Sequence, residues 1–396
     1  MVVYYFLAVI SCWFGLQSLL SGARYAAYVR RETSRPLPDF QPFASVIAPG
    51  RGMETGLIDN LRPLLAQDYP LYEVLFVFDA ADDPAIKIVD ELRRATTVPT
   101  RTVIAGPATD SGQKVHNLRV AVNEIDAQSE VLVFVDTDAR PATDWLRKLV
   151  APLADETLGA VTGYRWFVPE RGGIASRLRG VWNASVASAL GSDTGKNFCW
   201  GGSTAIRRTT FDRLNVSERW CGTVSDDFTI TRVLKEAKLP IHFTPNCLVP
   251  SVGDCDFREL IEFTTRQIKI TRVYASHLWL ALLLGSALFA IAFFGGLILL
   301  ILQILQILSN SLVLPLMLLL IFTLGATKSF LRFRAVSITL QTSRRDLLAH
   351  IFLWPIASLL YLYNAIVAGC SRRIKWRGIT YELKSPTEAV IISRDS

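Results

Sequence analysis

Four long hydrophobic runs alternate with polar stretches along the chain. They cover residues 2–20, 278–302, 312–331 and 347–368. A helix needs about 20 apolar residues to cross the hydrocarbon core of a bilayer, so each run predicts a membrane-spanning helix. The first run shows no small-residue cleavage site followed by a polar start, so we expect it to remain as an anchor.

The polar stretch between the first two runs has a different pattern, in which short apolar runs alternate with amphipathic segments. We expect strands at residues 44–48, 74–78, 100–104 and 131–135. We expect helices at residues 57–66, 85–95 and 115–125. Strands that alternate with helices are typical of a parallel sheet covered on both faces. An amphipathic helix is expected to follow at residues 257–274, where its apolar side can lie in the bilayer interface.

The fold class that follows is α/β, with a Rossmann-like domain, an N-terminal transmembrane helix and a C-terminal group of transmembrane or interfacial helices. The expected segments are an N-terminal anchor at 1–22, a basic juxtamembrane linker at 23–41, a cytoplasmic sheet domain at 42–255, an amphipathic interfacial segment at 256–276, transmembrane helices at 277–370 and a basic tail at 371–396.

Composition supports an integral membrane protein. The 396 residues are 51% hydrophobic and only 19% charged, with a mean hydropathy of +0.31, which excludes a disordered or fibrous chain. The net charge of +7 comes with basic residues that cluster beside the apolar runs, so we expect contacts with anionic lipid and no nucleic acid partner. The six cysteines include no C-x-x-C pair, so neither a zinc site nor a disulfide framework is indicated.

The basic clusters also predict an orientation. Arginines follow the first run and none precedes it, which places the N-terminus outside and the sheet domain in the cytoplasm of a multi-pass protein. Three further crossings would put the basic tail outside, against the same rule. Either one run is re-entrant or the tail lies on the interface, and the sequence leaves both possibilities open.

Acidic clusters follow two of the expected strands. Asp79 and Asp82 follow one strand, and Asp136 and Asp138 follow another. Ligands of open parallel sheets bind at the carboxyl ends of the strands. Alternate carboxylates in an extended segment can share one side and offer oxygen ligands to Mg²⁺ or Mn²⁺ that also binds a diphosphate. A solvated turn explains an isolated D-x-D equally well.

A third acidic pair, Asp226 and Asp227, opens an expected helix. Carboxylates are common there as caps, but beside two other acidic sites such a pair can supply a base that takes a proton from an acceptor hydroxyl. Trp200, after an expected strand, offers an aromatic face for a sugar ring, with burial in the core as the alternative.

Several motifs occur together in the order of a known family. The chain resembles ceramide glucosyltransferase and its bacterial relatives over most of its length, in the segments Asp82-Asp83-Pro84-Ala85, Lys114-Val115-His116-Asn117-Leu118, Asp136-Thr137-Asp138, Ser225-Asp226-Asp227-Phe228 and Trp376-Arg377-Gly378-Ile379-Thr380-Tyr381-Glu382-Leu383.

The resemblance implies an inverting GT-A-type transferase that moves a hexose from a UDP-sugar to a membrane lipid at the cytoplasmic face, with a divalent cation, Mg²⁺ or Mn²⁺. It implies that Asp79 or Asp82 lies near the uridine, and the motif match favours Asp82. Asp136 with Asp138 resembles the metal and diphosphate site, and Asp227 resembles the catalytic base.

Other roles implied by the resemblance concern the donor phosphates and the acceptor. Lys114 is a candidate for the donor phosphates, with a solvated lysine as the alternative. Asp226 stands where the family usually has glutamate, and we group it with Trp200 on the acceptor side.

The family's membrane-proximal motif, a glutamine or arginine followed two residues later by Arg-Trp, is altered in this chain. Arg266 and Lys269 keep positive charge that can steady the leaving UDP, but Ile270 replaces the tryptophan. Two alternatives therefore stay open: a processive polysaccharide synthase, and a membrane scaffold that has lost catalysis. Glucose is the hexose that the resemblance favours, and the acceptor lipid is left open.

Overall fold

The computed structural model describes residues 2–54 and 56–395. The chain divides into two compact units. The membrane unit comprises Met1–Arg30, Arg171–Ser188 and Asp254–Ser371, and the sheet unit comprises Arg31–Glu170, Ala189–Gly253 and Arg372–Ser396.

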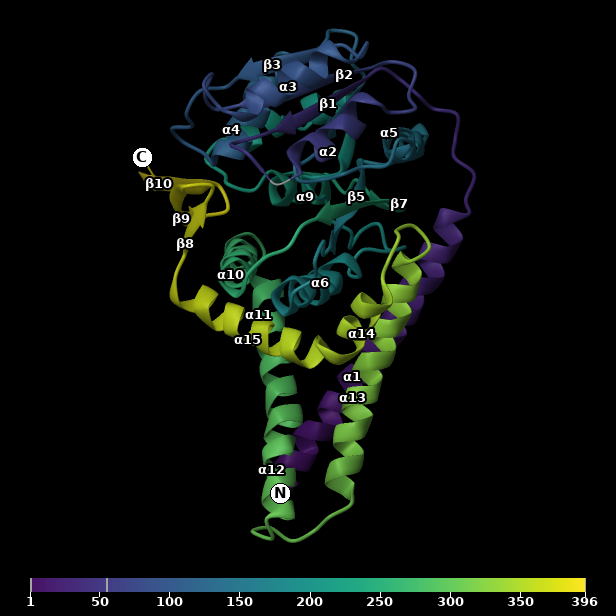
Figure 1. Cartoon of the computed structure of the whole chain (residues 1–396), viewed down its shortest axis with the longest axis vertical. Helices are drawn as coiled ribbons and strands as arrows, with labels where there is room; N and C mark the ends of the chain where they lie inside the picture. Colours follow the sequence, from purple (N-terminus) through teal and green to yellow (C-terminus); the bar gives the residue numbers. More distant parts are fainter. Residues whose placement is uncertain (1, 55, 396) are drawn as a thin grey trace. The chain divides into compact units, whose positions relative to one another are not determined.

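A seven-stranded sheet forms the centre of the sheet unit (Figure 1). Its strands are β1 Ala44–Pro49, β2 Tyr72–Phe78, β3 Thr100–Ile104, β4 Val131–Phe134, β5 Ala160–Val168, β6 Thr204–Arg207 and β7 Ile241–Val252. They lie in the order β3-β2-β1-β4-β6-β5-β7. Only β6, among the described strands of this sheet, runs antiparallel to both of its neighbours.

Three of the strands predicted from sequence, β1, β2 and β4, are mostly apolar and are buried on both faces, as strands between two helical layers must be, whereas the edge strand β3 is partly exposed. All seven residues of β2 are buried. Ala44 lies opposite both Tyr72 and Val131, so β1, β2 and β4 end at the same edge of the sheet. The expected α/β fold, with the strand arrangement of a GT-A glycosyltransferase, is confirmed.

Helices pack on this sheet and connect its strands. Those predicted from sequence are observed as α2 Leu57–Leu61 with a 3₁₀ turn at Arg62–Leu65, α3 Ala85–Arg94 and α4 Gln113–Val122. The others in this unit are α5 Trp145–Val150, the 3₁₀ turn Ala151–Ala154, α7 Arg208–Arg213, α8 Val216–Arg219 and α9 Asp226–Glu236. α4 contacts β1 and β2, while α5 contacts β5, β6 and β7. The strand expected before Trp200 is not formed, because residues 188–203 form a loop. The next strand, β6, begins after Trp200, at Thr204.

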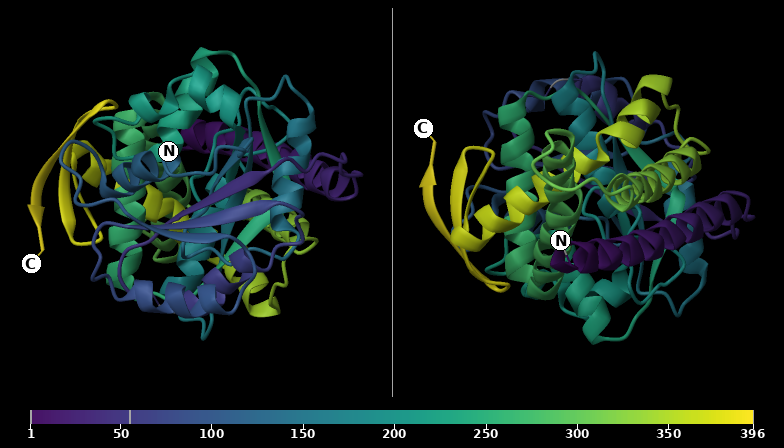
Figure 2. Two further views of the ribbon diagram at one scale, coloured as in Figure 1. Left: turned by 90° about the horizontal axis from the view of Figure 1, so that it is seen from above. Right: turned by 90° about the horizontal axis from the view of Figure 1, so that it is seen from below.

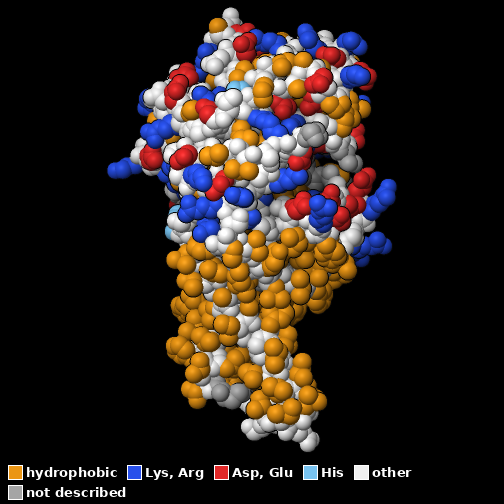
Figure 3. Space-filling view, turned by 90° about the vertical axis from the view of Figure 1, so that its left-hand side faces the viewer, with side chains coloured by type: hydrophobic (Ala, Val, Ile, Leu, Met, Phe, Trp, Pro, Cys, Tyr) orange, Lys and Arg blue, Asp and Glu red, His pale blue; other side chains and the backbone are white. Residues whose placement is uncertain are grey.

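The membrane unit is helical. It contains α1 Val2–Thr33, whose last residues belong to the sheet unit, α6 Ile174–Ala187, α10 Phe257–Tyr274, α11 Ser276–Phe289, a π-helical turn Ala290–Gly295, α12 Gly296–Ile304, α13 Val313–Val336, α14 Arg344–Phe352 and α15 Trp354–Cys370. Within residues 2–54 and 56–395, three helical segments are long and apolar enough to cross a membrane: α1, the continuous segment Ser276–Ile304, and α13. On the side of the molecule that Figure 3 shows, the surface in the region of these segments is mostly hydrophobic.

The fourth predicted span is broken. α14 and α15 meet at a bend of 60°. Pro355, in the first turn of α15, lacks the N–H that a continuous helix would need, so the chain ends one helix and starts another. The helix expected at 257–274 forms with those bounds as α10, where Asp256 and Glu259 make a reciprocal capping box.

The basic tail folds into a second, antiparallel sheet. Its strands are β8 Arg373–Trp376, β9 Ile379–Ser385 and β10 Glu388–Arg394. Figures 1 and 2 show them in yellow as one group of strands near the C-terminus. These residues belong to the sheet unit.

Candidate active site

Polar residues gather at the edge where the parallel strands end. Arg51 follows β1, Asp79 follows β2, and Asp136 and Asp138 follow β4. Because β1 lies between β2 and β4, the loops after these strands are neighbours. This is the edge at which open α/β sheets bind ligands.

A buried lysine joins two of the acidic sites. The Nζ atom of Lys114, in the first turn of α4, lies 2.7 Å from Oδ1 of Asp136 and 3.2 Å from Oδ1 of Asp226. Burial opposes charge on Lys114, but the two carboxylates outweigh it and raise its pKa. Burial also opposes ionisation of Asp136, yet Lys114 and Arg165 together lower the pKa of that carboxyl. The site therefore holds a fixed positive charge between two carboxyl groups.

Asp226 is the most enclosed member of this group. Only 4% of its side chain is exposed, and burial raises its pKa to about 6, against the opposing effect of Lys114. Its Oδ2 atom has no hydrogen-bond partner among the described residues. A Cβ atom on Gly201 would collide with this oxygen and come within 2.8 Å of the Lys114 ammonium, so the site requires glycine there.

Arg165 in β5 completes the charge balance around the D-x-D pair. Its guanidinium lies 3.8 Å from Asp138 and 4.0 Å from Asp136. The same group lies 5.0 Å from the ring centroid of Trp200, within the range of a cation–π contact. Trp200 is 4% exposed and packs on Tyr164. The indole therefore forms a platform beneath Arg165, and its role towards an acceptor stays a prediction.

Asp227 differs from its neighbour because it is only partly buried. Ser225 caps α9, and the Oδ1 atom of Asp227 accepts hydrogen bonds from the Ser225 hydroxyl and, at 2.7 Å, from the Phe228 N–H. The side chain is thus oriented by the first turn of the helix. An oriented carboxylate with solvent access has the properties that a general base needs.

The donor set at the D-x-D pair fits a divalent cation shared with a substrate. The described residues contain no cluster of three or more histidine, cysteine or acidic side chains that could hold a metal by themselves. Mg²⁺, however, is usually bound by one or two carboxylates together with substrate phosphates. Asp136 and Asp138 supply two carboxylates, and Oδ1 of Asp138 has no hydrogen-bond partner among the described residues.

The structure separates the two candidates for the nucleoside. Asp79 lies directly after β2 and pairs with Arg51, with 3.3 Å between Oδ2 and Nε. Asp82 is exposed in the following loop, where Asp83 accepts hydrogen bonds from the N–H groups of Gly52 and Ala85. The position of Asp79 at the strand end favours it, although the motif match favours Asp82.

Arg266 and Lys269, the two residues expected to contact the leaving UDP, lie on α10 in the membrane unit. The Arg266 guanidinium lies 5.7 Å from the ring centroid of Phe263, and burial lowers the pKa of Lys269. Their proposed role towards the leaving nucleotide stays a prediction.

Sequence reasoning missed Arg165, Gly201 and Arg51 as members of the site. Arg165 lies in a strand that the pattern did not identify, and Gly201 acts only through the room it leaves for Asp226. Arg51 had a detectable signal, since it lies two residues after the end of β1, in the loop next to the one that begins with Asp79.

The sheet order and the carboxylates at the strand ends define a glycosyltransferase with a GT-A fold. Residues 3–389 match the model of glycosyl transferase family 21, and the chain belongs to that family.

Similarity to individual proteins is more distant. A hyaluronan synthase of Streptococcus pyogenes is 31% identical over 109 residues, which are 27% of this chain and 26% of that protein, so the chain spans about a quarter of this relative. The mannosyltransferase of Pyrobaculum calidifontis, solved with GDP-Man and Mn²⁺, aligns with 92% of this chain and 99% of its own, at 19% identity and a TM-score of 0.49. Glucosyl-3-phosphoglycerate synthase of Mycobacterium tuberculosis, solved with phosphoglyceric acid, aligns with 58% of this chain and 78% of its own, at 15% identity and a TM-score of 0.36.

Proposed function

We propose that this protein is an inverting, membrane-bound transferase that moves a hexose, most readily glucose, from a UDP-sugar to the hydroxyl group of a membrane lipid. The observation that carries the proposal is the pairing of a partly accessible carboxylate, Asp227, with the enclosed group of Lys114, Asp136 and Asp226 at the ligand-binding edge of the sheet. Membership of family 21 supports the transfer of a sugar from a nucleotide.

The step is a single displacement. The lipid oxygen forms a bond to the anomeric carbon from the face opposite to the diphosphate, and the bond from that carbon to the phosphate oxygen breaks. Asp227 takes the hydroxyl proton, and the electron pair of the broken bond leaves with UDP. Because the site only has to position the reactants and stabilise charge, no covalent sugar–enzyme intermediate is required.

Asp136 and Asp138 are the residues that would hold a divalent cation, Mg²⁺ or Mn²⁺, together with the diphosphate. Such a cation supplies neutralisation of the charge that grows on the leaving group. Lys114 keeps Asp136 ionised for this purpose, and Arg165 fixes the orientation of both carboxylates. We expect EDTA to abolish turnover, and Mg²⁺ or Mn²⁺ to restore it.

The test uses the purified full-length protein with a panel of UDP-sugars, a divalent cation and a total lipid extract. Mass spectrometry should detect a lipid that has gained one hexose. Asp227→Asn should lower turnover by about 10³-fold, the contribution typical of a lost base together with misplaced charge. Asp212→Asn is the matched control, because Asp212 is an exposed carboxylate on α7 whose side chain is 61% accessible. Equal turnover in the two variants would refute the assignment of Asp227.

A second candidate is a processive polysaccharide synthase, favoured by the 109-residue similarity to hyaluronan synthase. Product size distinguishes the two, because a synthase makes a ladder of long chains whereas the proposed transferase stops after one sugar. If the wild-type protein releases no UDP with any donor, the third reading, a scaffold that has lost catalysis, replaces both.

A further inference from the structure

The C-terminal strands β8–β10 contact three loops of the sheet unit, and each of these loops carries part of the candidate site. Arg377 touches the loop between β1 and α2. Tyr381 and Arg394 touch the start of α4. The backbone oxygen of Thr387 lies so close to Gly222, in the loop before α9, that a Cβ atom there would collide with it.

Arg377 occupies an unfavourable backbone conformation. It has φ of 51° in the turn between β8 and β9, and Gly378 after it has φ of 74°. Two successive positive φ values are typical of two-residue hairpin turns, for which Asn-Gly is the favoured sequence. Arginine is strained in this conformation, and such strain in a folded protein points to a function for the side chain.

The Arg377 side chain reaches the loop that carries Arg51. Its guanidinium pairs with Glu54 and donates a hydrogen bond of 3.1 Å to the carbonyl oxygen of Arg51. Arg51 in turn pairs with Asp79 at the end of β2. The contacts therefore run from the tail to the strand end that we assign to the nucleoside.

The hydrogen bond from Arg377 to the Arg51 backbone thus brings two cationic residues together. Burial and the neighbouring Arg51 both lower the pKa of Arg377. The Nη1 atom of Arg51 is buried and has no hydrogen-bond partner among the described residues. An unused donor on a cation beside a second cation is a suitable place for an anionic group such as a phosphate.

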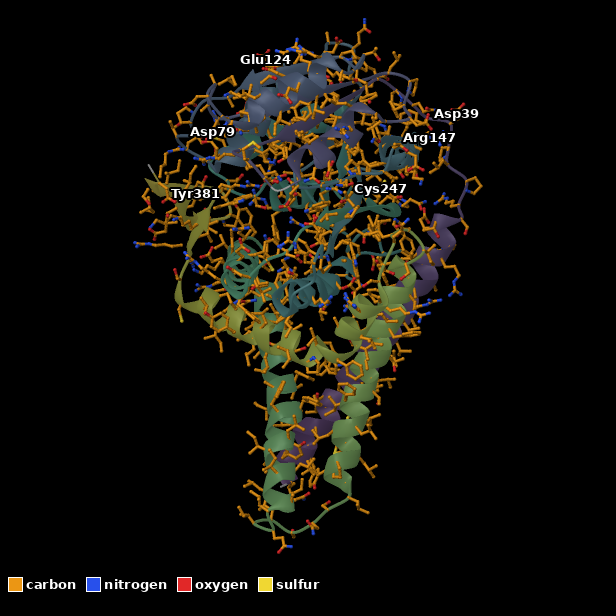
Figure 4. All side chains as sticks on the ribbon, in the orientation of Figure 1. Asp39, Asp79, Glu124, Arg147, Cys247 and Tyr381 are labelled. Carbon is orange, nitrogen blue, oxygen red and sulfur yellow. The ribbon has the colours of Figure 1, made fainter. Side chains whose placement is uncertain are left out.

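A second set of contacts fixes the start of α4. Tyr381 is 2% exposed, and its Oη atom accepts a hydrogen bond of 3.1 Å from the N–H of Gln113. Arg394 donates to the side-chain oxygen of the same glutamine, at 3.3 Å, and to the carbonyl oxygen of Ala108. Gln113 directly precedes Lys114, so these bonds set the position from which the lysine reaches Asp136. In Figure 4, the labelled Asp79 and Tyr381 lie on the same side of the sheet unit.

We propose that β8–β10 act as a clamp for the nucleotide-sugar donor, in which Arg377 and Tyr381 are positioning residues. Arg377 holds Arg51 beside Asp79 for the nucleoside diphosphate, and Tyr381 holds the first turn of α4, and with it Lys114. The inference rests on the proposed function for the identity of the donor. The clamp proposal gives strands β8–β10 a role in donor affinity in addition to a role in folding.

The decisive variant is Arg377→Asn in the full-length protein. Asparagine tolerates positive φ, so the hairpin turn is kept while the guanidinium is lost. We expect a dissociation constant for UDP about tenfold higher and a donor KM raised by the same factor, as for the loss of one charge-assisted contact. The KM for the lipid and the inversion of configuration at the anomeric carbon should not change.

Tyr381→Phe and Lys384→Gln complete the experiment. Tyr381→Phe removes only the oxygen that caps α4, and should weaken UDP binding by about fivefold. Lys384 lies on β9 with its side chain 46% exposed and forms an ion pair with Glu382 on the same strand, so Lys384→Gln should bind UDP as the wild type does. If Arg377→Asn is less stable than the wild type, the UDP affinity of Tyr381→Phe decides whether the clamp proposal holds.

The outcomes separate the clamp from the proposed function. Wild-type UDP affinity in both Arg377→Asn and Tyr381→Phe would overturn the clamp, even if the wild-type protein makes glycolipid. If the wild-type protein binds UDP but makes no product, the proposed reaction fails while the binding data still test the clamp. A wild-type protein that binds no UDP would overturn both.

Discussion

Replacing Lys114 by methionine removes the positive charge between Asp136 and Asp226 at almost constant volume. At an effective dielectric constant of about 20, the ion pairs at 2.7 Å and 3.2 Å correspond to roughly 6 and roughly 5 kcal/mol of attraction. Desolvation of the charges offsets most of this, at several kcal/mol per ion. Removal of one partner from a buried ion pair then costs about 3 kcal/mol, because Asp226 loses its ion pair and Asp136 keeps only the contact with Arg165 at 4.0 Å.

The pH dependence makes this prediction specific. Burial already raises the pKa of Asp226 to about 6 against the effect of Lys114. The loss of the lysine raises this pKa further above the unfolded value of about 3.9, so the folded Lys114→Met protein binds more protons than the unfolded chain. Its stability therefore falls as pH rises. The deficit relative to wild type should be small at pH 5 and reach its full size at pH 8.

Urea unfolding of the full-length protein in detergent, followed by tryptophan fluorescence at both pH values, measures this deficit. The matched control is Lys148→Met on α5. Lys148 pairs with Asp144 at 2.6 Å, but both side chains are partly exposed, so its loss should cost about 0.5 kcal/mol. A deficit in Lys114→Met that matches the control, or that is equal at the two pH values, would refute the reasoning.

Two further substitutions test the packing of the sheet unit. Gly201→Ala should lower turnover at least tenfold and destabilise the fold by about 2 kcal/mol, because the added methyl group collides with Asp226. Gly191→Ala is the control, since no atom lies within 4 Å of the added Cβ, and it should be neutral in activity and melting assays. Equal effects of the two alanines would contradict the close packing. The Glu32 carboxylate lies 3.2 Å from the His242 ring, and this hydrogen bond is the main cause that lowers the pKa of Glu32. A lowered pKa stabilises the fold above the unfolded value of about 4.3 and loses that effect as pH falls. Glu32→Gln should therefore reduce the melting temperature by a few degrees at pH 7 and hardly at pH 3, and an equal reduction at both would exclude the pair as the cause.

The parts of the fold that sequence predicted are those with a local signal. β1, β2 and β4 are continuous apolar runs because both of their faces are buried, and α10 is bounded by its own capping box. The acidic residues after β2 and β4 could be placed at one edge because parallel strands end together. The length of an apolar run and the charged residues beside it can be recognised within a few residues, and they were sufficient to predict these elements.

The missed features depend on contacts between distant parts of the chain. Nothing near Lys114 in sequence indicates that Asp226, more than a hundred positions later, shares its charge. The tail did contain a signal, since Ile379, Tyr381 and Leu383 are buried and alternate with more exposed residues, the period of a half-buried strand. Its many basic residues predicted contacts with anionic lipid and left its position open, and the contact with Gln113 cannot be predicted from charge or from the alternation.

The placement of the tail also decides whether the number of membrane crossings between residues 253 and 372 is even or odd. Because Tyr381 bonds to Gln113, the tail and the catalytic residues lie on the same side of any membrane that the chain crosses. The chain leaves the sheet unit after Gly253 and returns to it at Arg372, so it must cross an even number of times in between. Two crossings, by Ser276–Ile304 and α13, satisfy this condition only if the bent pair α14–α15 enters and leaves by the same face. The basic residues from Arg31 onward and the basic tail both belong to the sheet unit, so they lie on the same side of such a membrane, as the positive-inside rule requires.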